Sequence, residues 1–399
     1  MKFIYLIGVR LYELAVRIAA LWNPKARKWV AGRKAIWSKL DNWKREEKTL
    51  YWFHCASLGE FEQGRPIIEG LKSTEDCQVV LTFFSPSGYE IRSNYDLADL
   101  VIYLPLERKS HVTRFLDAIA PDAVFFVKYE FWAQFIFEAK KRGAKLYSVA
   151  AVFREKQIFF KRYGGFMRSV LQCFDKIFTQ DEKSHRLLNG IGIQSIVAGD
   201  TRYDRVLSNA EKVEGIPLIE NFVGDSSVLV VGSSWKADDE VILPFINHPD
   251  FDWKIIIAPH EIHENRIVEL QKQITKSVVR YSQMNTSDGA ATVLIIDNIG
   301  MLMNVYQYAT IAYVGGGFGT GLHNILEPAS FNVPVVFGNQ HEKFFEAKLF
   351  MDAGIGFEVA NAADFEQCLK ELMDKFEAKK VAEYMQKHQG ATQRILEHV

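Results

Sequence analysis

From Leu50 onward, the chain alternates short apolar runs with amphipathic segments, and this alternation limits the possible folds more than any other feature. The runs are rich in β-branched and aromatic residues, whereas the segments between them have helical spacing. In the first half, the runs lie at positions 51–56, 78–84, 99–105, 123–129, 145–153 and 175–180. Strands that alternate with helices predict a doubly wound parallel α/β sheet.

The alternation pauses over residues 199–225, a polar stretch that contains Pro217, and then restarts. The second set of apolar runs lies at positions 226–234, 252–260, 276–282, 292–298, 310–316 and 333–339. We therefore predict two Rossmann-like α/β domains, 49–205 and 206–399, facing a central cleft. The last helices, from about Ala363, could pack back on the first domain.

Residues 1–48 form a separate basic segment. From Met1 to Arg45 there are eleven Lys and Arg against Glu13 and Asp41, a net charge of +9, which leaves −10 for the remainder. The apolar stretch 3–22 is interrupted by Arg10, Glu13 and Arg17, which argues against a secretory signal peptide. Basic residues interleaved with tryptophans follow, a composition that suits a membrane surface.

We therefore expect an N-terminal membrane-associated helix that anchors the protein on the cytoplasmic side of the inner membrane. A first helix packed on a soluble core is the alternative. Nucleic acid is not expected as a partner, because no nucleic-acid-binding motif accompanies the basic segment. The four cysteines are scattered without CxxC spacing, which indicates reduced thiols and no zinc site.

Polar residues follow several predicted strands of the first domain, where ligands of open α/β sheets bind. They are Ser57, Gly59 and Glu60 after the first strand, Ser87 and Gly88 after the second, and Lys128 and Glu130 after the fourth. Gly59 is expected to allow a tight turn. Glu60 either decorates the start of a helix or acts as a general base whose pKa is raised in a partly desolvated cleft.

The second domain carries a similar set of residues at its strand ends. These are Ser233, Ser234, Lys236, His260, Gly316, Gly317, Asn324 and Glu327. The glycine-rich run that begins at Gly315 suggests backbone close to a ligand phosphate at a helix N-terminus. It matches neither a dinucleotide fingerprint nor a P-loop. Glu327 could accept hydrogen bonds from ribose hydroxyls, or it could simply cap its helix.

Taken together, ordered motifs across nearly the whole chain resemble the 3-deoxy-D-manno-octulosonate (Kdo) transferases. The motifs are "WFHCASLGE", "LTFFSPSG", "YEFWAQ", "AGDTRYDR", "GSSWKADDE", "AYVGGGF" and "HNILEPASFNVPVVFG". Members of this family are membrane-associated glycosyltransferases of the GT-B fold that use CMP-Kdo and a lipid A precursor. The resemblance therefore implies an inverting transfer of Kdo to lipid IVA in lipopolysaccharide biosynthesis.

The resemblance also implies roles for particular residues. Glu60 would deprotonate the acceptor hydroxyl, and Glu130 would assist at the acceptor side. CMP-Kdo would contact Ser233, Ser234, Lys236, His260, Gly316, Gly317, Asn324 and Glu327. Arg202 would lie near the interdomain junction and, with Ser57, Gly59, Ser87, Gly88 and Lys128, would border the acceptor or donor.

No metal or other cofactor is expected, because a nucleoside monophosphate leaving group needs less charge neutralisation than a diphosphate does. The sequence also has no Asp-x-Asp motif near a strand end. Two rival functions remain. One is a GT-B transferase that uses a UDP-sugar on a different lipid, and the other is a membrane-bound nucleotide-binding scaffold without catalytic activity.

Overall fold

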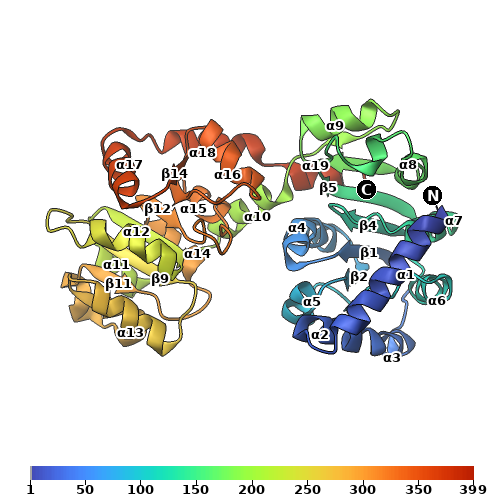
Figure 1. The fold of residues 1–399 in the computed structure, drawn as a ribbon, viewed down its shortest axis with the longest axis horizontal. Coiled ribbons are helices and arrows are strands. Elements are labelled where there is room, and N and C mark those ends of the chain that lie inside the picture. Colours follow the sequence, from blue (N-terminus) through green and yellow to red (C-terminus); the bar gives the residue numbers. More distant parts are fainter. Residues whose placement is uncertain (1) are drawn as a thin grey trace. The chain divides into compact units, whose positions relative to one another are not determined.

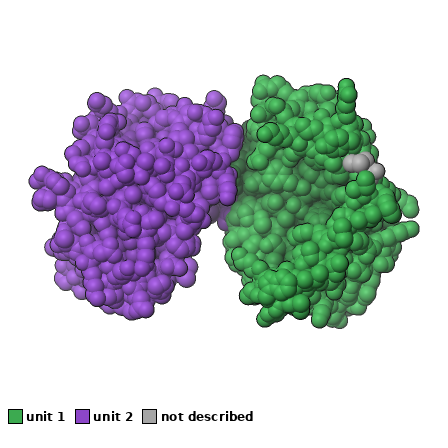
Figure 2. Space-filling model, in the orientation of Figure 1, with its two compact units in different colours: residues 1–204, 389–399 green, residues 205–388 purple. Residues whose placement is uncertain are grey.

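The computed structural model describes residues 2–399 and divides the chain into two compact units (Figures 1 and 2). The first unit comprises the residues up to Asp204 together with Gln389–Val399, and the second comprises Arg205–His388. The boundary falls inside helix α10 (Thr201–Ala210). Over the described residues, each unit contains one parallel seven-stranded sheet.

The sheet of the first unit has the strand order β3-β2-β1-β4-β5-β6-β7, all parallel (Figure 1). The chain reverses its direction of travel across the sheet between β1 and β4, which makes this pair the topological switch point. The strands are β1 (Thr49–Cys55), β2 (Cys77–Phe83), β3 (Leu100–Tyr103), β4 (Ala123–Val127), β5 (Lys145–Ala151), β6 (Lys176–Thr179) and β7 (Ile196–Val197).

Successive residues of β1 enter different cores because side chains alternate across a strand. Leu50 and Trp52 pack in a cluster with helices α3, α6 and α7, whereas Tyr51 and Phe53 pack with α4 and α19. The helices of this unit are α1 (Lys2–Ala19), α2 (Pro24–Lys34), α3 (Ile36–Asn42), α4 (Leu58–Thr74), α5 (Pro86–Arg92), α6 (Lys109–Ile119), α7 (Ala133–Lys141), α8 (Gly165–Leu171), α9 (Glu182–Asn189) and α19 (Ala391–Leu396).

The end of the chain is tied to the first unit by hydrogen bonds. The carboxylate of Asp204 accepts from the backbone N–H groups of Gly390 and Thr392, the latter at 2.6 Å. The backbone of Gly70 on α4 leaves room for the side chain of Leu396 on α19, since a Cβ there would lie 2.5 Å from a Leu396 methyl carbon. These contacts place the last eleven residues with the first sheet.

The sheet of the second unit has the order β10-β11-β9-β8-β12-β13-β14, and its switch point lies between β8 and β12. Its strands are β8 (Val228–Ser234), β9 (Lys254–Pro259), β10 (Val278–Arg280), β11 (Val293–Ile295), β12 (Ile311–Val314), β13 (Val335–Gly338) and β14 (Gly356–Val359). Its helices are α11 (Pro217–Val223), α12 (Lys236–Ile246), α13 (Glu264–Gln273), α14 (Leu302–Val305), α15 (Leu326–Ala329), α16 (Phe345–Asp352), α17 (Ala362–Lys375) and α18 (Lys379–His388).

The predicted α/β fold class is confirmed, since both units are parallel sheets wound with helices. All twelve predicted strands form. Two edge strands, β7 and β14, were not predicted from the sequence, because β7 has only two residues and β14 is half exposed. Lys128 lies beyond the end of β4, which stops at Val127.

Helix α1 carries an exposed row of large apolar side chains. Leu21 and Trp22, just beyond its end, are 75% and 69% exposed, and Phe3 is 74% exposed. Within residues 2–399, no helix combines the length and the apolar character that a membrane crossing requires.

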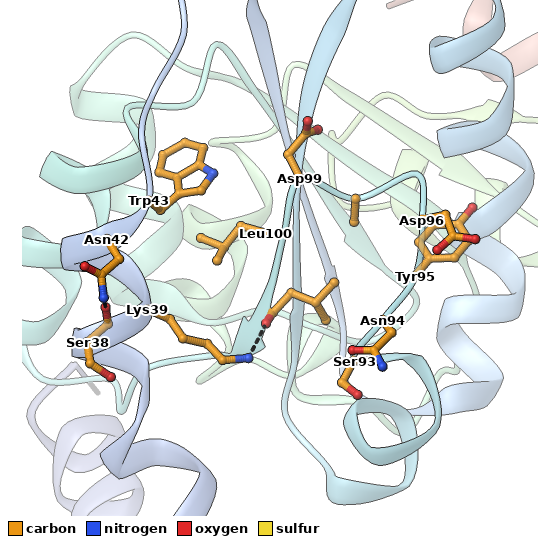
Figure 3. Close-up of a pocket in the computed structure, with 12 residues that line it drawn as sticks. Ser38, Lys39, Asn42, Trp43, Ser93, Asn94, Tyr95, Asp96, Asp99 and Leu100 are labelled. Carbon is orange, nitrogen blue, oxygen red and sulfur yellow. Dashed lines mark hydrogen bonds between the residues drawn. The ribbon is translucent and has the colours of Figure 1, made fainter.

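The strand β3 forms one edge of the first sheet, and a hollow of about 570 Å³ runs beside it (Figure 3). The Lys39 ammonium group donates to the Val101 carbonyl at 3.5 Å and to the Tyr89 hydroxyl at 2.8 Å. A lysine across an edge strand discourages pairing with another chain. None of the predicted site residues lines this hollow.

Candidate functional site

Glu60 lies at the switch point of the first unit, one turn into the helix that follows β1. Ser57 is the N-cap of α4 in extended conformation, and its side chain makes no capping hydrogen bond. The Glu60 carboxylate instead fixes the turn before the helix, since its Oε2 accepts from the backbone N–H of Ala56. A carboxylate is favoured at this position by the helix dipole.

The tight turn predicted at Gly59 is not present. Gly59 is a helical residue without a positive φ, and a Cβ built on it would meet nothing within 4 Å. The glycine therefore leaves open space beside Glu60 and relieves no backbone strain.

The electrostatic surroundings of Glu60 favour its protonated form. Burial, reinforced by the charge of Glu130, raises the pKa of Glu60 to about 7, although the Ala56 N–H and the charge of Lys128 oppose this rise. A carboxylate with a pKa near neutrality can accept a proton from an attacking hydroxyl and later release it. The coupling to Glu130 also shows that the two carboxylates share one electrostatic environment.

Glu130 is held by two donors from the same unit. Its Oε2 accepts from the indole N–H of Trp132 at 2.5 Å and lies 3.1 Å from Nε2 of His54. His54 is fully buried on β1, and its Nδ1 lies 2.9 Å from the Thr82 hydroxyl on β2. The position of this carboxylate is therefore fixed by residues from β1 and from the loop after β4.

Lys128 has a strained backbone at the same edge of the sheet. Its φ of 64° is in the left-handed region, which a non-glycine residue seldom adopts. The predicted fourth strand, 123–129, ends earlier than expected, because β4 stops at Val127 before Lys128. Strained residues of this kind concentrate at functional sites, where the surrounding structure holds them in place.

A hollow of about 370 Å³ opens beside Glu130. Tyr5 of α1 lies in its wall, and the hydroxyl of Tyr5 donates to Glu107 at 2.7 Å. The remaining walls are largely aromatic and aliphatic: Tyr129, Phe131, Trp132, Gln157, Ile158, Phe159 and Met167. The N-terminal helix thus contributes directly to a largely apolar hollow next to a predicted catalytic carboxylate.

The remaining predicted residues of the first unit have mainly structural contacts. Gly88 on α5 is needed for packing, because a Cβ there would lie 2.3 Å from the ring of Phe83. The Ser87 hydroxyl is exposed and lies 2.8 Å from that of Ser85, which caps α5. Arg202 forms an ion pair with Asp200 at 2.7 Å.

Three aromatic rings stack at the switch point of the second unit. The ring of His260, which follows β9, lies 4.3 Å from Trp235 and 4.5 Å from His323. The Trp235 indole N–H also donates to Nε2 of His323 at 3.0 Å. Burial and the neighbouring His260 lower the pKa of His323 to about 4, so its ring is neutral at pH 7. Rings stacked in this way offer a flat aromatic surface.

Other predicted donor residues in the same region differ in their surroundings. Ser233 has a φ of 54°, and the hydroxyl of Ser234 is buried with no hydrogen-bond partner in the described chain. Lys236 instead forms an exposed ion pair with Glu269 at 2.6 Å. The structure therefore places Lys236 on the outer side of α12, with its charge already matched.

The glycine-rich run is shaped by close backbone contacts within the protein. Gly316 has a φ of 91°, and a Cβ there would lie 2.2 Å from the Gly321 carbonyl oxygen. A Cβ on Gly317 would lie 2.6 Å from the backbone of Gly338. The helix that follows the run, α15, has only four residues, and phosphate binding at its N-terminus stays a prediction. Sheet packing thus accounts for these glycines without a ligand.

Asp238 holds the start of this run in place, and the sequence did not indicate that role. Asp238 is fully buried, and it accepts from the backbone N–H of Gly316 at 3.0 Å and of Trp235 at 2.8 Å. The hydroxyl of Tyr313 on β12 donates to it at 2.7 Å. One carboxylate thus connects the ends of β8 and β12 across the switch point.

Asn324 and Glu327 are brought together by α15. The amide of Asn324 donates to Glu327 at 3.0 Å, and its carbonyl accepts from the backbone N–H of Leu326 at 3.2 Å. Burial raises the pKa of Glu327, while Asn324 and the charge of Arg205 oppose this rise. The pair thus organises the first turn of α15, and contact of Glu327 with ribose hydroxyls stays a prediction.

Four contributing residues were missed from the sequence: His54, Trp132, Asp238 and Tyr313. His54 and Tyr313 lie within apolar runs that predicted only strands, and Trp132 lies in an aromatic stretch typical of a core. Asp238 lies beside Asp239 in a pair that matches no Asp-x-Asp motif, so its role gives no sequence signal. Among residues 2–399, no three His, Cys, Asp or Glu side chains gather in an arrangement that could hold a metal ion.

Comparison with known proteins supports the resemblance in the motifs. A family model described as 3-deoxy-D-manno-octulosonic-acid transferase matches residues 31–205. A 3-deoxy-D-manno-octulosonic acid transferase from Aquifex aeolicus is 28% identical over 351 residues, which cover 86% of this chain and 91% of that protein. A transferase of the same name from Chlamydophila psittaci is 29% identical over 78% of this chain and 75% of that protein.

A third relative is longer. A bifunctional glycosyltransferase/methyltransferase from Fusobacterium nucleatum is 26% identical over 341 residues, which cover 82% of this chain. The match covers 53% of that protein, so this chain spans about half the length of that relative.

Solved structures share the fold at lower sequence identity. A UDP-GlcNAc 2-epimerase from Neisseria meningitidis has a TM-score of 0.57 and 17% identity, covering 88% of this chain and 98% of that one. An epimerase from Methanocaldococcus jannaschii gives a TM-score of 0.56 at 15% identity, covering 88% and 100%. These matches confirm the GT-B class of fold.

Proposed function

We propose that this chain, whose resemblance to the Kdo transferase family is confirmed by the matches above, transfers Kdo from CMP-Kdo to a lipid A precursor. The observation that carries the proposal is Glu60 at the switch point of the first sheet, with a pKa raised to about 7 by burial and by Glu130. A group transfer to an alcohol needs such a proton acceptor.

In the proposed reaction, an acceptor hydroxyl oxygen attacks the anomeric carbon of Kdo with inversion. The bond from that carbon to the phosphate oxygen of CMP breaks, and CMP leaves with the bonding electron pair. The hydroxyl proton passes to the Glu60 carboxylate. Glu130, held by His54 and Trp132, raises the proton affinity of Glu60 and orients the acceptor.

The acceptor is proposed to lie along the hollow beside Glu130. Its walls are mostly aromatic and aliphatic, which suits a lipid-linked sugar better than a free one. Tyr5 of α1 lies in the wall, and α1 also carries the exposed apolar side chains. An amphipathic helix of this kind can lie in a membrane interface. We therefore place the protein on the cytoplasmic side of the inner membrane.

The donor is proposed to bind at the switch point of the second unit. The stacked rings of Trp235, His260 and His323 offer a flat aromatic surface for a base. Asn324 and Glu327 supply polar groups that can pair with ribose hydroxyls. The departing CMP carries modest charge, and we expect transfer to proceed without a metal ion.

The direct test is an assay with purified protein, CMP-Kdo and a lipid A precursor, with products resolved by mass. The proposal predicts a product heavier by one or more Kdo units, together with release of CMP and no change on addition of EDTA. Transfer from a UDP-sugar but not from CMP-Kdo would overturn the donor assignment. Nucleotide binding without any transfer would favour the alternative of a nucleotide-binding scaffold without catalytic activity.

A further inference from the structure

Arg33, near the end of α2, is a buried cation without a carboxylate partner among the described residues. Its side chain is packed among aromatic rings, with the guanidinium carbon 3.8 Å from the centre of the Trp29 ring and 4.8 Å from that of Phe84. The residue is only 8% exposed. Its Nη1 donates to the Trp29 carbonyl at 3.2 Å and its Nη2 to the Phe84 carbonyl at 3.0 Å, while Nε has no partner.

This arrangement leaves a positive charge uncompensated. Burial lowers the pKa of Arg33 to about 9, which still leaves it protonated at neutral pH. Charged side chains are seldom buried unless they are paired, because desolvation disfavours an isolated ion. Aromatic rings and two carbonyls offset part of this cost, but they do not supply a full negative charge. An anion from outside the chain would complete the site.

A cavity is present where such an anion could bind. A pocket of about 210 Å³, which we name the Arg33 pocket, is lined by Arg33 and by two further cations, Arg17 and Lys34. Its other walls are mostly apolar: Val30, Ile36, Trp37, Pro105, Leu106 and His111. Lys34 forms no ion pair or hydrogen bond through its amine within the described chain.

The carboxylate nearest to this cluster is shared between two arginines. Glu13 accepts from Arg17 at 2.9 Å and from Arg108 through Nε at 3.1 Å, so it neutralises at most one of them. Burial opposes the ionisation of Glu13, but the hydrogen bonds from Arg108 and Arg17 outweigh it and lower its pKa. The pKa of His111 is lowered by burial and by Arg108, so its ring adds no charge. A net positive charge therefore remains at the pocket.

The volume of the pocket limits the size of the ligand that can bind in it. About 210 Å³ is below the roughly 300–1,000 Å³ typical of pockets for cofactors and drug-sized molecules. It is several times the roughly 30 Å³ that one water molecule occupies in the liquid. A tetrahedral oxyanion fits these limits, and arginine pairs with phosphate through parallel hydrogen bonds.

The location of the pocket identifies the source of the phosphate. Arg17 lies on α1, among side chains that face solvent with their apolar surface: Leu14 is 54% exposed, Ile18 48% and Leu21 75%. A helix of this kind places its basic residues at the level of lipid headgroups. We propose that the Arg33 pocket binds the phosphomonoester headgroup of a membrane lipid and so fixes the orientation of the first unit on the bilayer.

This inference rests on the proposed membrane association and not on the identity of the transferred sugar. The test uses the full chain and phosphatidylcholine vesicles that contain either phosphatidic acid or phosphatidylglycerol, adjusted to the same surface potential. Bulk electrostatic attraction gives equal binding to both vesicles, whereas a phosphomonoester pocket prefers phosphatidic acid. We expect a preference of roughly five- to tenfold, as for one well-formed charge-assisted contact.

The test relies on variants of exposed residues, so that a loss of the preference for phosphatidic acid does not simply report misfolding. Arg33→Gln changes a buried side chain and so tests folding as well as binding. Arg17→Gln and Lys34→Gln, which alter exposed groups of the same pocket, therefore carry the test. Each should lose the preference for phosphatidic acid. Lys25→Gln removes the same charge from the exposed part of α2 and should weaken binding to both vesicles equally. Equal binding of the unmodified protein to both vesicles, or an undiminished preference in both pocket variants, would overturn the proposal.

Two further outcomes distinguish a lipid headgroup from free inorganic phosphate as the ligand of the Arg33 pocket. Inorganic phosphate added at the ionic strength of a sulfate control should compete only weakly, because a free ion lacks the membrane contacts of α1. A pocket that bound inorganic phosphate but gave no vesicle preference would overturn the assignment to a lipid. If no vesicle binds, membrane association and this inference fail together, yet Kdo transfer to a detergent-dispersed acceptor would still stand.

Discussion

The imidazole of His54 lies with Nε2 3.1 Å from the Glu130 carboxylate and with Nδ1 2.9 Å from the Thr82 hydroxyl. A fully buried histidine on the first strand therefore connects the predicted acceptor-side carboxylate to the second strand. The indole of Trp132 donates to the same carboxylate oxygen at 2.5 Å. Glu130 is thus positioned by a buried residue of β1 and by an aromatic residue in the wall of the adjoining hollow.

The two donors to Glu130 provide the first prediction. Trp132→Phe removes one hydrogen bond while keeping an aromatic ring, and His54→Gln removes the other. We expect each to lower kcat/KM for the acceptor roughly tenfold, since a displaced group near the reacting atoms weakens transition-state stabilisation. The dissociation constant for CMP should not change. Trp253→Phe in the second unit is the control, and a matching loss there would contradict the positioning role.

The raised pKa of Glu60 predicts a pH-dependent stability. The folded protein holds the proton up to about pH 7, whereas the unfolded chain releases it near the ordinary value of 4.5, so this group makes the protein less stable as pH rises between the two. Glu60→Gln removes the effect. Its gain in unfolding free energy over the unmodified protein should grow between pH 5 and pH 8, to at most about 3 kcal/mol.

Denaturant titrations of both proteins at the two pH values measure this difference. A gain that is the same at pH 5 and pH 8 would show that Glu60 ionises normally in the folded protein. Glu69→Gln on the same helix, where Glu69 pairs with Arg65 at 2.6 Å, is the control for loss of a carboxylate from α4.

Asp238 organises the glycine-rich run, which gives a third prediction. Asp238→Asn replaces an acceptor for two backbone N–H groups and one hydroxyl in a fully buried site. We expect a loss of about 2–4 kcal/mol in unfolding free energy and weaker CMP binding. Tyr313→Phe removes only the hydroxyl and should cost about 1 kcal/mol. Equal losses in the two variants would contradict the role assigned to the backbone contacts.

The fourth prediction concerns the part of Glu327 in binding the donor nucleotide. Glu327→Gln keeps the shape of the side chain but changes how it can accept from ribose hydroxyls and from Asn324. We expect CMP to bind roughly tenfold more weakly in a calorimetric titration, with little change in the unfolding temperature. Glu342→Gln, an exposed carboxylate of the same unit, is the control. Unaltered CMP affinity in the Glu327 variant would exclude it from the nucleotide site.

The sequence predicted the fold well because buried parallel strands are unusually apolar. The runs around Trp52 and Val230 are recognisable without knowledge of their partners, and their order along the chain indicates the winding of each sheet. The strands β7 and β14 were missed because an edge strand is short and partly exposed. The end of β4 was misplaced because Tyr129 extends the run in sequence past Lys128, whereas the backbone of Lys128 is left-handed.

The candidate site could be predicted in part, because residues at strand ends are adjacent to apolar runs that are easy to find. Glu60 and Glu130 were identified in this way. His54, which contacts Glu130, could not be, since it is indistinguishable by pattern from other strand residues. Asp238 could not be either, since it acts across 78 positions of sequence on Gly316. The sequence also could not show why Gly317 must be glycine. The requirement comes from the close approach of its backbone to Gly338 on the neighbouring strand.

The central claim is that the Glu60 carboxylate takes the proton of the acceptor hydroxyl. The most direct measurement compares Glu60→Gln with the control Glu69→Gln for Kdo transfer from CMP-Kdo and for CMP affinity, with kcat/KM of the unmodified protein followed from pH 5 to pH 9. We predict at least a roughly 100-fold lower kcat for Glu60→Gln at unchanged CMP affinity, and a rate that rises with pH through about 7. Undiminished turnover in Glu60→Gln would contradict the account.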